Sequence, residues 1–168
     1  MGKNIFRGEA ESPYHLSVGA VLVNEKGEVA THYFKEFETF EKVKFFDFYL
    51  LMRETVEPGE SIEGAVSRGI KEEFGATGEI ERFLGTLVTK FLRRGTWIEK
   101  TTTYFLVSLE SFDLNLQTKD GETRVSQVQW QSIDFLIEKM KEQGKKYERT
   151  DLDESIILER AKKFIESK

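Results

Sequence analysis

The chain has 168 residues, of which 39% are hydrophobic and 33% are charged, and its formal net charge is −5 at pH 7. These values exclude an intrinsically disordered chain, and the length is sufficient for one domain with a hydrophobic core. The acidic balance argues against a protein that coats nucleic acid, because such proteins are usually basic.

The sequence contains no cysteine, which excludes disulfide bonds, thiolate zinc sites and a cysteine nucleophile. No apolar run approaches the roughly 20 residues needed to span a bilayer, and residues 1–16 lack the apolar stretch of a signal peptide. We therefore expect a cytoplasmic protein with no membrane partner. Two histidines are too few for a histidine-rich metal site, and we expect neither His15 nor His32 to be functional.

The first third of the chain predicts strands. A β-branched run over residues 16–24 and a strand-like run over residues 28–37 flank the turn-forming sequence Glu-Lys-Gly, so the two runs predict a hairpin. Residues 37–45 mix charges with aromatic side chains and predict a loop or a strand extension. The apolar run over residues 45–53 predicts one buried strand.

The second half predicts further strands and then two helices. Residues 79–92 predict a strand with a bulge at Gly85, residues 96–110 a long strand, residues 113–124 a loop and residues 125–130 a short strand. A helix is expected from Ser132 to Gly144, and another over residues 151–168. We expect an α+β fold in a single domain over residues 1–168, with an N-terminal extension over residues 1–15 and a C-terminal helix over residues 151–168.

Residues 57–76, EPGESIEGAVSRGIKEEFGA, predict a helix between these two halves. Ser61 is a suitable N-cap and Gly75 a suitable C-terminal cap. A core-facing stripe recurs every four residues, at Ile62, Val66, Ile70 and Phe74.

The polar face of this helix carries a group of carboxylates. Arg68 and Glu72 lie one turn apart, Glu73 lies beside Glu72, and Glu60 precedes the helix. Carboxylates that converge repel one another unless a cation neutralises them, and hard oxygen ligands suit Mg²⁺ or Mn²⁺. The alternative is a solvated face on which Arg68 and Glu72 form an ordinary ion pair.

The order of these residues resembles the signature of the Nudix hydrolases. That signature consists of Gly, five residues, Glu, seven residues, Arg-Glu, a hydrophobic residue, any residue, Glu-Glu, any residue, Gly and a hydrophobic residue. The matching positions here are Glu60, Arg68, Ile70, Glu72, Glu73, Gly75 and Ala76. The order of the predicted strands extends the resemblance over roughly residues 16–139.

The resemblance implies a fold and an activity. The fold is an α/β/α sandwich with a mixed central sheet between helices. The activity is Mg²⁺-dependent (or Mn²⁺-dependent) hydrolysis of the pyrophosphate bond in a nucleoside diphosphate linked to another group. A nucleotide-type small molecule is thus the expected partner, and a homodimer stays open because family members are often dimers.

The resemblance also implies roles for single residues. Glu72 and Glu73 would hold the metal, with Glu60 as a further ligand directly or through water. Arg68 would orient Glu72 or Glu73 through a charge-assisted hydrogen bond. Arg53 is a candidate for contact with a substrate phosphate, although a solvated arginine at a strand end is an equal alternative.

Two positions depart from the signature. Its first glycine corresponds to Glu54, and the glutamate after the arginine corresponds to Gly69. In the family that glutamate binds metal or acts as the base, so a base would have to come from elsewhere. The candidates are Glu99, Asp120 and Glu122.

Gly69 is costly because glycine destabilises a helix interior by about 1 kcal/mol relative to alanine. Drift after loss of function, a need for space at the site, and simple close packing are three explanations. The second functional hypothesis is accordingly a binding module on the Nudix fold, with weak or no hydrolysis, that senses a nucleotide or contacts a partner.

Overall fold

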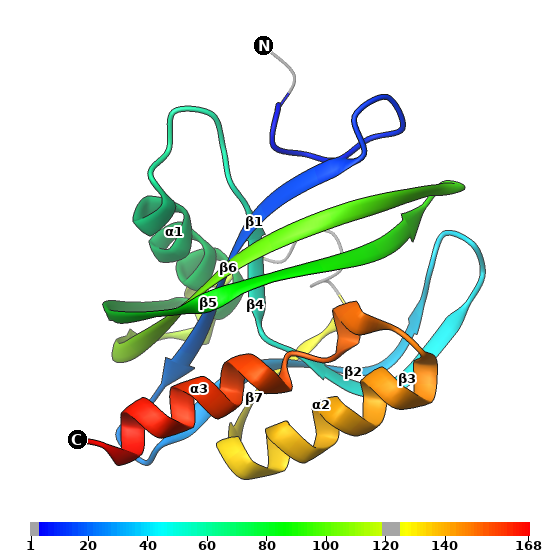
Figure 1. Ribbon diagram of the computed structural model, residues 1–168. Coiled ribbons are helices and arrows are strands. Elements are labelled where there is room, and N and C mark those ends of the chain that lie inside the picture. The colour runs from blue at the N-terminus through cyan, green and yellow to red at the C-terminus, as the bar shows by residue number, and fades with distance from the viewer. Residues whose placement is uncertain (1–3, 119–124) are drawn as a thin grey trace.

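A mixed sheet separates one helix from a pair of helices in the computed structural model, which describes residues 4–118 and 125–168. Figure 1 shows α1 on one side of the sheet and α2 and α3 on the other. The helices are α1 (Ile62–Phe74), α2 (Ile133–Tyr147) and α3 (Ser155–Glu166). The strands are β1 (Tyr14–Val23), β2 (Glu28–Glu38), β3 (Lys44–Leu50), β4 (Met52–Thr55), β5 (Ala76–Arg93), β6 (Thr96–Phe112) and β7 (Gln127–Ser132).

The strand order confirms the α+β class and the mixed sheet. The main path runs β3-β2-β1-β6-β5, while β4 pairs with β1 and β7 pairs with β2. Strands β1 and β6 are parallel, and the other pairs are antiparallel. The predicted hairpin of β1 and β2 is present, and the predicted bulge of β5 lies at Gly85, whose φ is +137°.

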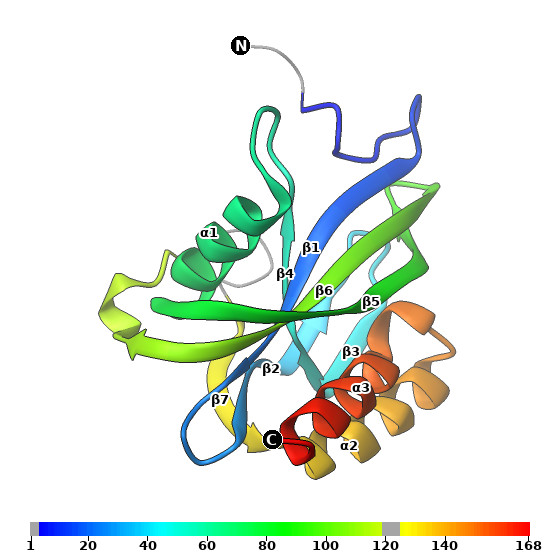
Figure 2. The same cartoon turned by 60° about the vertical axis from the view of Figure 1, so that its left-hand side comes forward.

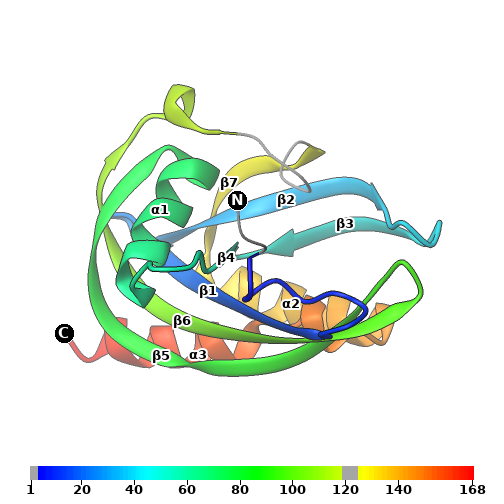
Figure 3. The same cartoon turned by 90° about the horizontal axis from the view of Figure 1, so that it is seen from above.

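The sheet is strongly curved around α1. Figure 2 shows the long hairpin of β5 and β6 passing between α1 and the pair α2 and α3. Figure 3 shows α1 within the concave side formed by these strands together with β2 and β7. Among the described residues one buried cluster lies between the sheet and α2 with α3, a second lies between the sheet and α1, and a third gathers aromatic residues of β2 and β3 with Leu152. Helix α1 thereby packs its buried face against the sheet.

The prediction of one strand over residues 45–53 was wrong, because the chain changes partners at Leu51. Strand β3 pairs with β2, whereas β4 pairs with β1. The Leu51 N–H between them donates to the Glu154 carboxylate at 2.9 Å. The apolar run over residues 45–53 gives no sign of this break, because it continues without interruption from one strand into the next.

The two C-terminal helices also differ from their predicted bounds. Helix α2 continues past Gly144 to Tyr147 and ends at Glu148, which has a φ of +51°. Gly144 serves packing instead, because a Cβ there would lie 2.6 Å from Asp153 Cβ. The segment expected to be helical from residue 151 begins with a 3-10 turn, η3 (Thr150–Leu152), before α3.

None of the helices in the described ranges is long and apolar enough to cross a membrane.

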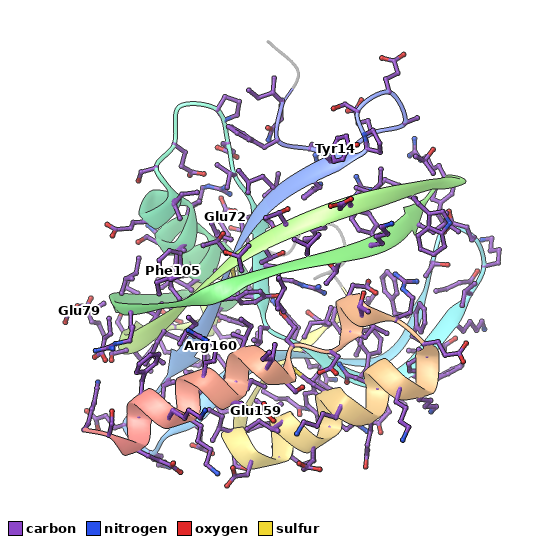
Figure 4. The ribbon with its side chains drawn as sticks, in the orientation of Figure 1. Tyr14, Glu72, Glu79, Phe105, Glu159 and Arg160 are labelled. Carbon is purple, nitrogen blue, oxygen red and sulfur yellow. The ribbon has the colours of Figure 1, made fainter. Side chains whose placement is uncertain are left out.

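We predict that Glu154→Ala lowers the free energy of unfolding by about 2–4 kcal/mol, measured by urea denaturation. Glu154 is 1% exposed and accepts hydrogen bonds from Leu51 N–H and, at 2.5 Å, from the Tyr104 hydroxyl. Each buried donor left without a partner costs about 1–3 kcal/mol. As a control, Glu159→Ala should cost less than about 1 kcal/mol, since Glu159 forms an exposed pair with Lys141 between α3 and α2 (Figure 4). Equal losses in the two variants would contradict the prediction.

Candidate functional site

Helix α1 carries the candidate site and forms as its sequence predicts. The Ser61 hydroxyl accepts a hydrogen bond from Gly64 N–H at 2.9 Å, and Gly75 closes the helix with a φ of +66°. The core stripe is shifted from the expected one, because Ile62 is 36% exposed. The buried positions of the helix are Ala65, Val66, Gly69, Ile70, Glu73 and Phe74. Glu73 and Gly69 therefore face the protein interior.

Arg68 is the positively charged side chain around which the carboxylates of the site are arranged. Its guanidinium makes two hydrogen bonds to Glu60, from Nε at 2.8 Å and from Nη2 at 3.0 Å. It also donates to Glu72 at 3.2 Å and to the Thr55 carbonyl at 2.8 Å. The hydrogen bond from Arg68 holds the pKa of Glu60 below its usual value. Both Glu60 oxygens thus face Arg68, which makes Glu60 the anchor of the arginine.

Glu73 lies in a different environment from Glu72. It is 7% exposed, and its Oε1 is 2.9 Å from His32 Nε2. The other ring nitrogen of His32 is 3.0 Å from the Ser126 hydroxyl. An ionised Glu73 fixes Nε2 as the donor, so Nδ1 accepts from Ser126. Burial raises the pKa of Glu73, and the hydrogen bond from His32 opposes that rise.

One oxygen of Glu73 has no partner. Within the described residues, Oε2 of Glu73 is buried and accepts no hydrogen bond. A buried carboxylate oxygen left unpaired is costly, so a site of this kind calls for a ligand. Glu73 therefore has one oxygen held by the protein and one available for a ligand.

Glu54 completes the acidic group from β4. Its carboxylate is 3.4 Å from Arg68 Nη1. Its Cβ is 3.0 Å from the position that a Cβ on Gly69 would take. Burial raises the pKa of Glu54 to about 7, and the charges of Glu73 and Glu72 add to that rise while Arg68 opposes it. The carboxylates of Glu54, Glu72 and Glu73 thus share one electrostatic neighbourhood, and Figure 4 shows Glu72 on α1.

The remaining predicted residues lie away from this group. Arg53 points to the other face of β4, where it donates to the Asp151 carbonyl at 3.0 Å and lies 4.0 Å from Glu154. Glu99 is opposite Tyr14 in the sheet, four residues along β1 from the Val18 partner of Glu54. Asp120 and Glu122 lie outside the described residues. The phosphate contact of Arg53 and the base role of Glu99 stay predictions.

His15, on β1, is connected with Arg68 through Thr55. Its Nδ1 accepts from Gly8 N–H at 3.1 Å, so its Nε2 donates to the Thr55 hydroxyl at 3.0 Å. The carbonyl of Thr55 in turn accepts from Arg68. Burial, followed by the charges of Lys100, Arg93 and Arg7, lowers the pKa of His15 to about 3.

The donors in this group suit a hard divalent cation. Carboxylate oxygens are the ligands that Mg²⁺ and Mn²⁺ prefer, and Glu73 Oε2 is a buried oxygen without a protein partner in the described part of the chain. Across residues 4–118 and 125–168, no three histidine, aspartate or glutamate side chains stand as a preformed metal cluster. The guanidinium of Arg68 instead forms ion pairs with the carboxylates of Glu60 and Glu72.

Comparison with known proteins identifies the family. The family model described as NUDIX domain matches residues 13–150. The chain belongs to the Nudix family. This match covers more of the chain than the roughly 16–139 expected from the order of strands, and it extends through α2 to the start of η3. No curated protein matches this Nudix sequence significantly.

Solved structures share the Nudix fold. A NUDIX hydrolase from Nitrosomonas europaea aligns with a TM-score of 0.60 and 19% identity, over 91% of this chain and 89% of that one. A MutT protein from Methanosarcina mazei Go1 aligns with a TM-score of 0.53 and 20% identity, over 95% and 98% of the two chains. A UDP-X diphosphatase aligns with a TM-score of 0.54 and 16% identity, over 90% of this chain and 63% of that one. At such identities the likeness supports the fold alone.

Sequence analysis missed two residues that hold the acidic group in place. His32 and Ser126 are distant in sequence from α1, and only the sheet brings them to Glu73. The one available signal was that His32 is a polar residue within a buried strand, because such residues require a hydrogen-bond partner.

We predict that Gly69→Ala lowers the free energy of unfolding by about 1 kcal/mol. A Cβ at Gly69 would lie 2.7 Å from Met52 Sδ and 3.0 Å from Glu54 Cβ, and overpacking costs about 1–3 kcal/mol. That cost exceeds the gain of about 1 kcal/mol in helix propensity. Gly64→Ala is the control in chemical denaturation, because a Cβ at this exposed site of the same helix would lie 3.0 Å from its nearest neighbour, the Ser61 hydroxyl oxygen. It should cost less than Gly69→Ala, and equal effects of the two substitutions would show that position 69 is no more crowded than position 64.

We predict that His15 contributes a loss of stability as pH falls below about 6.5, against which the raised pKa of Glu54 acts in the opposite direction. The pKa of His15 is about 3 when folded and about 6.5 when unfolded, so protons bind preferentially to the unfolded chain across that range. The loss attributable to His15 at pH 5 should be on the order of 1–2 kcal/mol. Denaturation of wild type and His15→Gln at pH 7.5 and pH 5 measures it. The difference between the two proteins should shrink at pH 5, and a constant difference would contradict the prediction.

Proposed function

We propose that this Nudix domain hydrolyses a pyrophosphate bond in a nucleoside diphosphate linked to another group, with Mg²⁺ or Mn²⁺ as cofactor. The observation that carries the proposal is the buried, unpartnered oxygen of Glu73 beside the carboxylates of Glu72 and Glu54. Membership of the Nudix family supports the same reaction class. A nucleotide-type substrate and a cytoplasmic setting belong to this proposal.

In this proposal Glu72 and Glu73 hold the cation. When bound, the cation neutralises the pyrophosphate oxygens and lowers the pKa of a coordinated water molecule. His32 keeps Oε1 of Glu73 engaged, which fixes the orientation of the carboxylate and leaves Oε2 for the ligand. Such outer partners orient metal ligands, and their loss weakens metal affinity 10- to 100-fold.

Arg68 positions the carboxylate of Glu72. The paired hydrogen bonds to Glu60 fix the plane of the guanidinium, and Thr55 and Glu72 accept from its remaining N–H groups. A lysine cannot replace this geometry, because an ammonium group lacks the planar fork. Glu60 thus acts as a positioning residue for Arg68, and its role as a further metal ligand, directly or through water, stays a prediction.

The reaction itself exchanges one bond for another. A new bond forms between the water oxygen and one phosphorus, and the bond from that phosphorus to the bridging oxygen breaks. The departing phosphate keeps the bridging oxygen and its electron pair, while the water gives up a proton to a carboxylate base. The two products each carry one of the former phosphates.

We predict that a screen of nucleotide-containing pyrophosphates with Mg²⁺ and Mn²⁺, scored by product release, detects turnover. Glu73→Gln should lower kcat/KM at least about tenfold, since removing the charge removes about 1.4 kcal/mol or more of stabilisation. Glu63→Gln changes an exposed carboxylate in the first turn of the same helix and should leave turnover unaltered. Near-ultraviolet circular dichroism verifies that both variants are folded.

The contrary result separates the two functional hypotheses. If the protein binds one of these compounds in calorimetry and no condition gives product, the hydrolase proposal fails and the binding module replaces it. If product forms equally with Glu73→Gln, the site of hydrolysis lies elsewhere.

A further inference from the structure

The space above Gly69 is already occupied by β4. A Cβ on Gly69 would come within 3.0 Å of Glu54 Cβ and within 2.7 Å of Met52 Sδ. Real Cβ atoms essentially never approach another atom more closely than 3.0 Å. A side chain on the helix at this position would therefore crowd Glu54 and displace the Met52 side chain.

Strand β4 directs Glu54 toward α1 through simple alternation. Successive side chains of a strand point to opposite faces, so Met52 and Glu54 share the face that meets α1, while Arg53 points the other way. The backbone of Glu54 pairs with Val18 in β1, which lies in the interior of the sheet. The position of Glu54 is thus set by a rigid element.

Glu54 belongs to the same charged group as the helix carboxylates. Nη1 of Arg68 lies 3.4 Å from Glu54 and 3.2 Å from Glu72. Burial raises the pKa of Glu54, and the charges of Glu73 and Glu72 add to that rise, so the three carboxylates lie within electrostatic range of one another. The Glu54 side chain is 25% exposed, so it is partly withdrawn from water and still accessible to a ligand.

A second observation shows that this group lacks a partner. Oε2 of Glu73 is buried and accepts no hydrogen bond from any described residue. Arg68 does not remedy this, because its hydrogen bonds go to Glu60, Glu72 and Thr55. The carboxylates of the described residues do not form a preformed metal cluster, so a cation that binds the unpaired oxygen of Glu73 would have to draw a neighbouring carboxylate toward it.

We propose that Glu54 is a ligand for the divalent cation and that it supplies, from β4, the carboxylate that the Nudix signature places on α1 at the position of Gly69. The two departures from the signature are then one exchange. The carboxylate has moved from the helix to the strand, and the glycine on the helix makes room for it. This inference rests on the metal site of the proposed function.

The exchange explains the glycine better than either alternative. Drift after loss of function would leave position 69 free to accept many side chains, but the contacts with Met52 and Glu54 close it. Simple packing explains the absence of a side chain, yet it does not explain why the packing neighbour is an acidic residue beside two further carboxylates.

The test is Mn²⁺ binding to the full chain, measured by electron paramagnetic resonance of free Mn²⁺ and by calorimetry. Glu54→Gln keeps the size of the side chain and removes its charge, and it should raise the Kd for Mn²⁺ at least about tenfold. Glu57→Gln is the matched control, because Glu57 is also within 3.8 Å of Arg68 but its side chain is 60% exposed. Its Kd should stay within about twofold of wild type.

The double variant Glu54→Gly with Gly69→Glu restores the order of the signature and tests the exchange directly. Its Kd for Mn²⁺ should return to within about threefold of wild type. Glu54→Gly alone should bind at least about tenfold more weakly, because it has lost one carboxylate. Gly69→Glu alone should be less stable than wild type, since two side chains then compete for one volume. Denaturation curves establish which variants are folded.

The outcomes separate this inference from the proposed function. If wild type binds Mn²⁺ and Glu54→Gln binds it equally well, Glu54 is no ligand and the inference fails while the metal site stands. If wild type binds no Mn²⁺, both fail. If Glu54→Gln weakens binding while no pyrophosphate is turned over, the inference stands and the hydrolase proposal fails.

Discussion

The close approach of α1 to β4 is the constraint on which the acidic site depends. A helix and a strand can come this near only where one of them lacks a side chain, and Gly69 provides that position. The approach brings the carboxylates of two secondary-structure elements around one arginine. Glu73 is buried there, and His32 on β2 holds one of its oxygens. The site is therefore a product of helix placement as much as of residue identity.

The charge arrangement around Arg68 divides the carboxylates into two kinds. Glu60 is matched to the guanidinium by two parallel hydrogen bonds, the geometry in which arginine and carboxylate bind most strongly. Glu54 and Glu72 lie near the same nitrogen of Arg68, Nη1, at the longer distances of 3.4 Å and 3.2 Å. Glu73 has no contact with Arg68 at all among the ion pairs of the described residues. The positive charge of Arg68 is thus concentrated at the start of the helix, and Glu73 at the buried end lies outside its ion pairs.

Local signals predicted much of this molecule. The caps Ser61 and Gly75, the hairpin of β1 and β2 and the bulge at Gly85 each follow from the conformational preference of one or two residues. The signature in α1 selected Arg68, Glu72 and Glu73, whose roles stay predictions. Contacts between distant segments could not be predicted in this way. The break at Leu51 depends on Glu154, about a hundred positions later, and a continuous apolar run gives no sign of it.

The site showed the same division between local and distant information. Glu54 and Gly69 were each visible as a departure from the signature, but their contact exists only in three dimensions. A helical wheel places position 69 between Glu72 and Glu73 and says nothing of the strand that lies above it. His32 and Ser126 carry no mark in sequence that connects them with Glu73.

The hydrogen bond from Leu51 to Glu154 has a consequence for the time at which the site is completed. Every carboxylate of the acidic group is contained within residues 54–73, so all of them leave the ribosome early. The residue that secures the entrance to β4 leaves it much later, when α3 is about to form. A nascent chain short of residue 154 therefore carries the charges of the site on a strand with one end untethered. Completion of the acidic group is accordingly coupled to synthesis of the C-terminal helix, although that helix contributes none of the group's carboxylates.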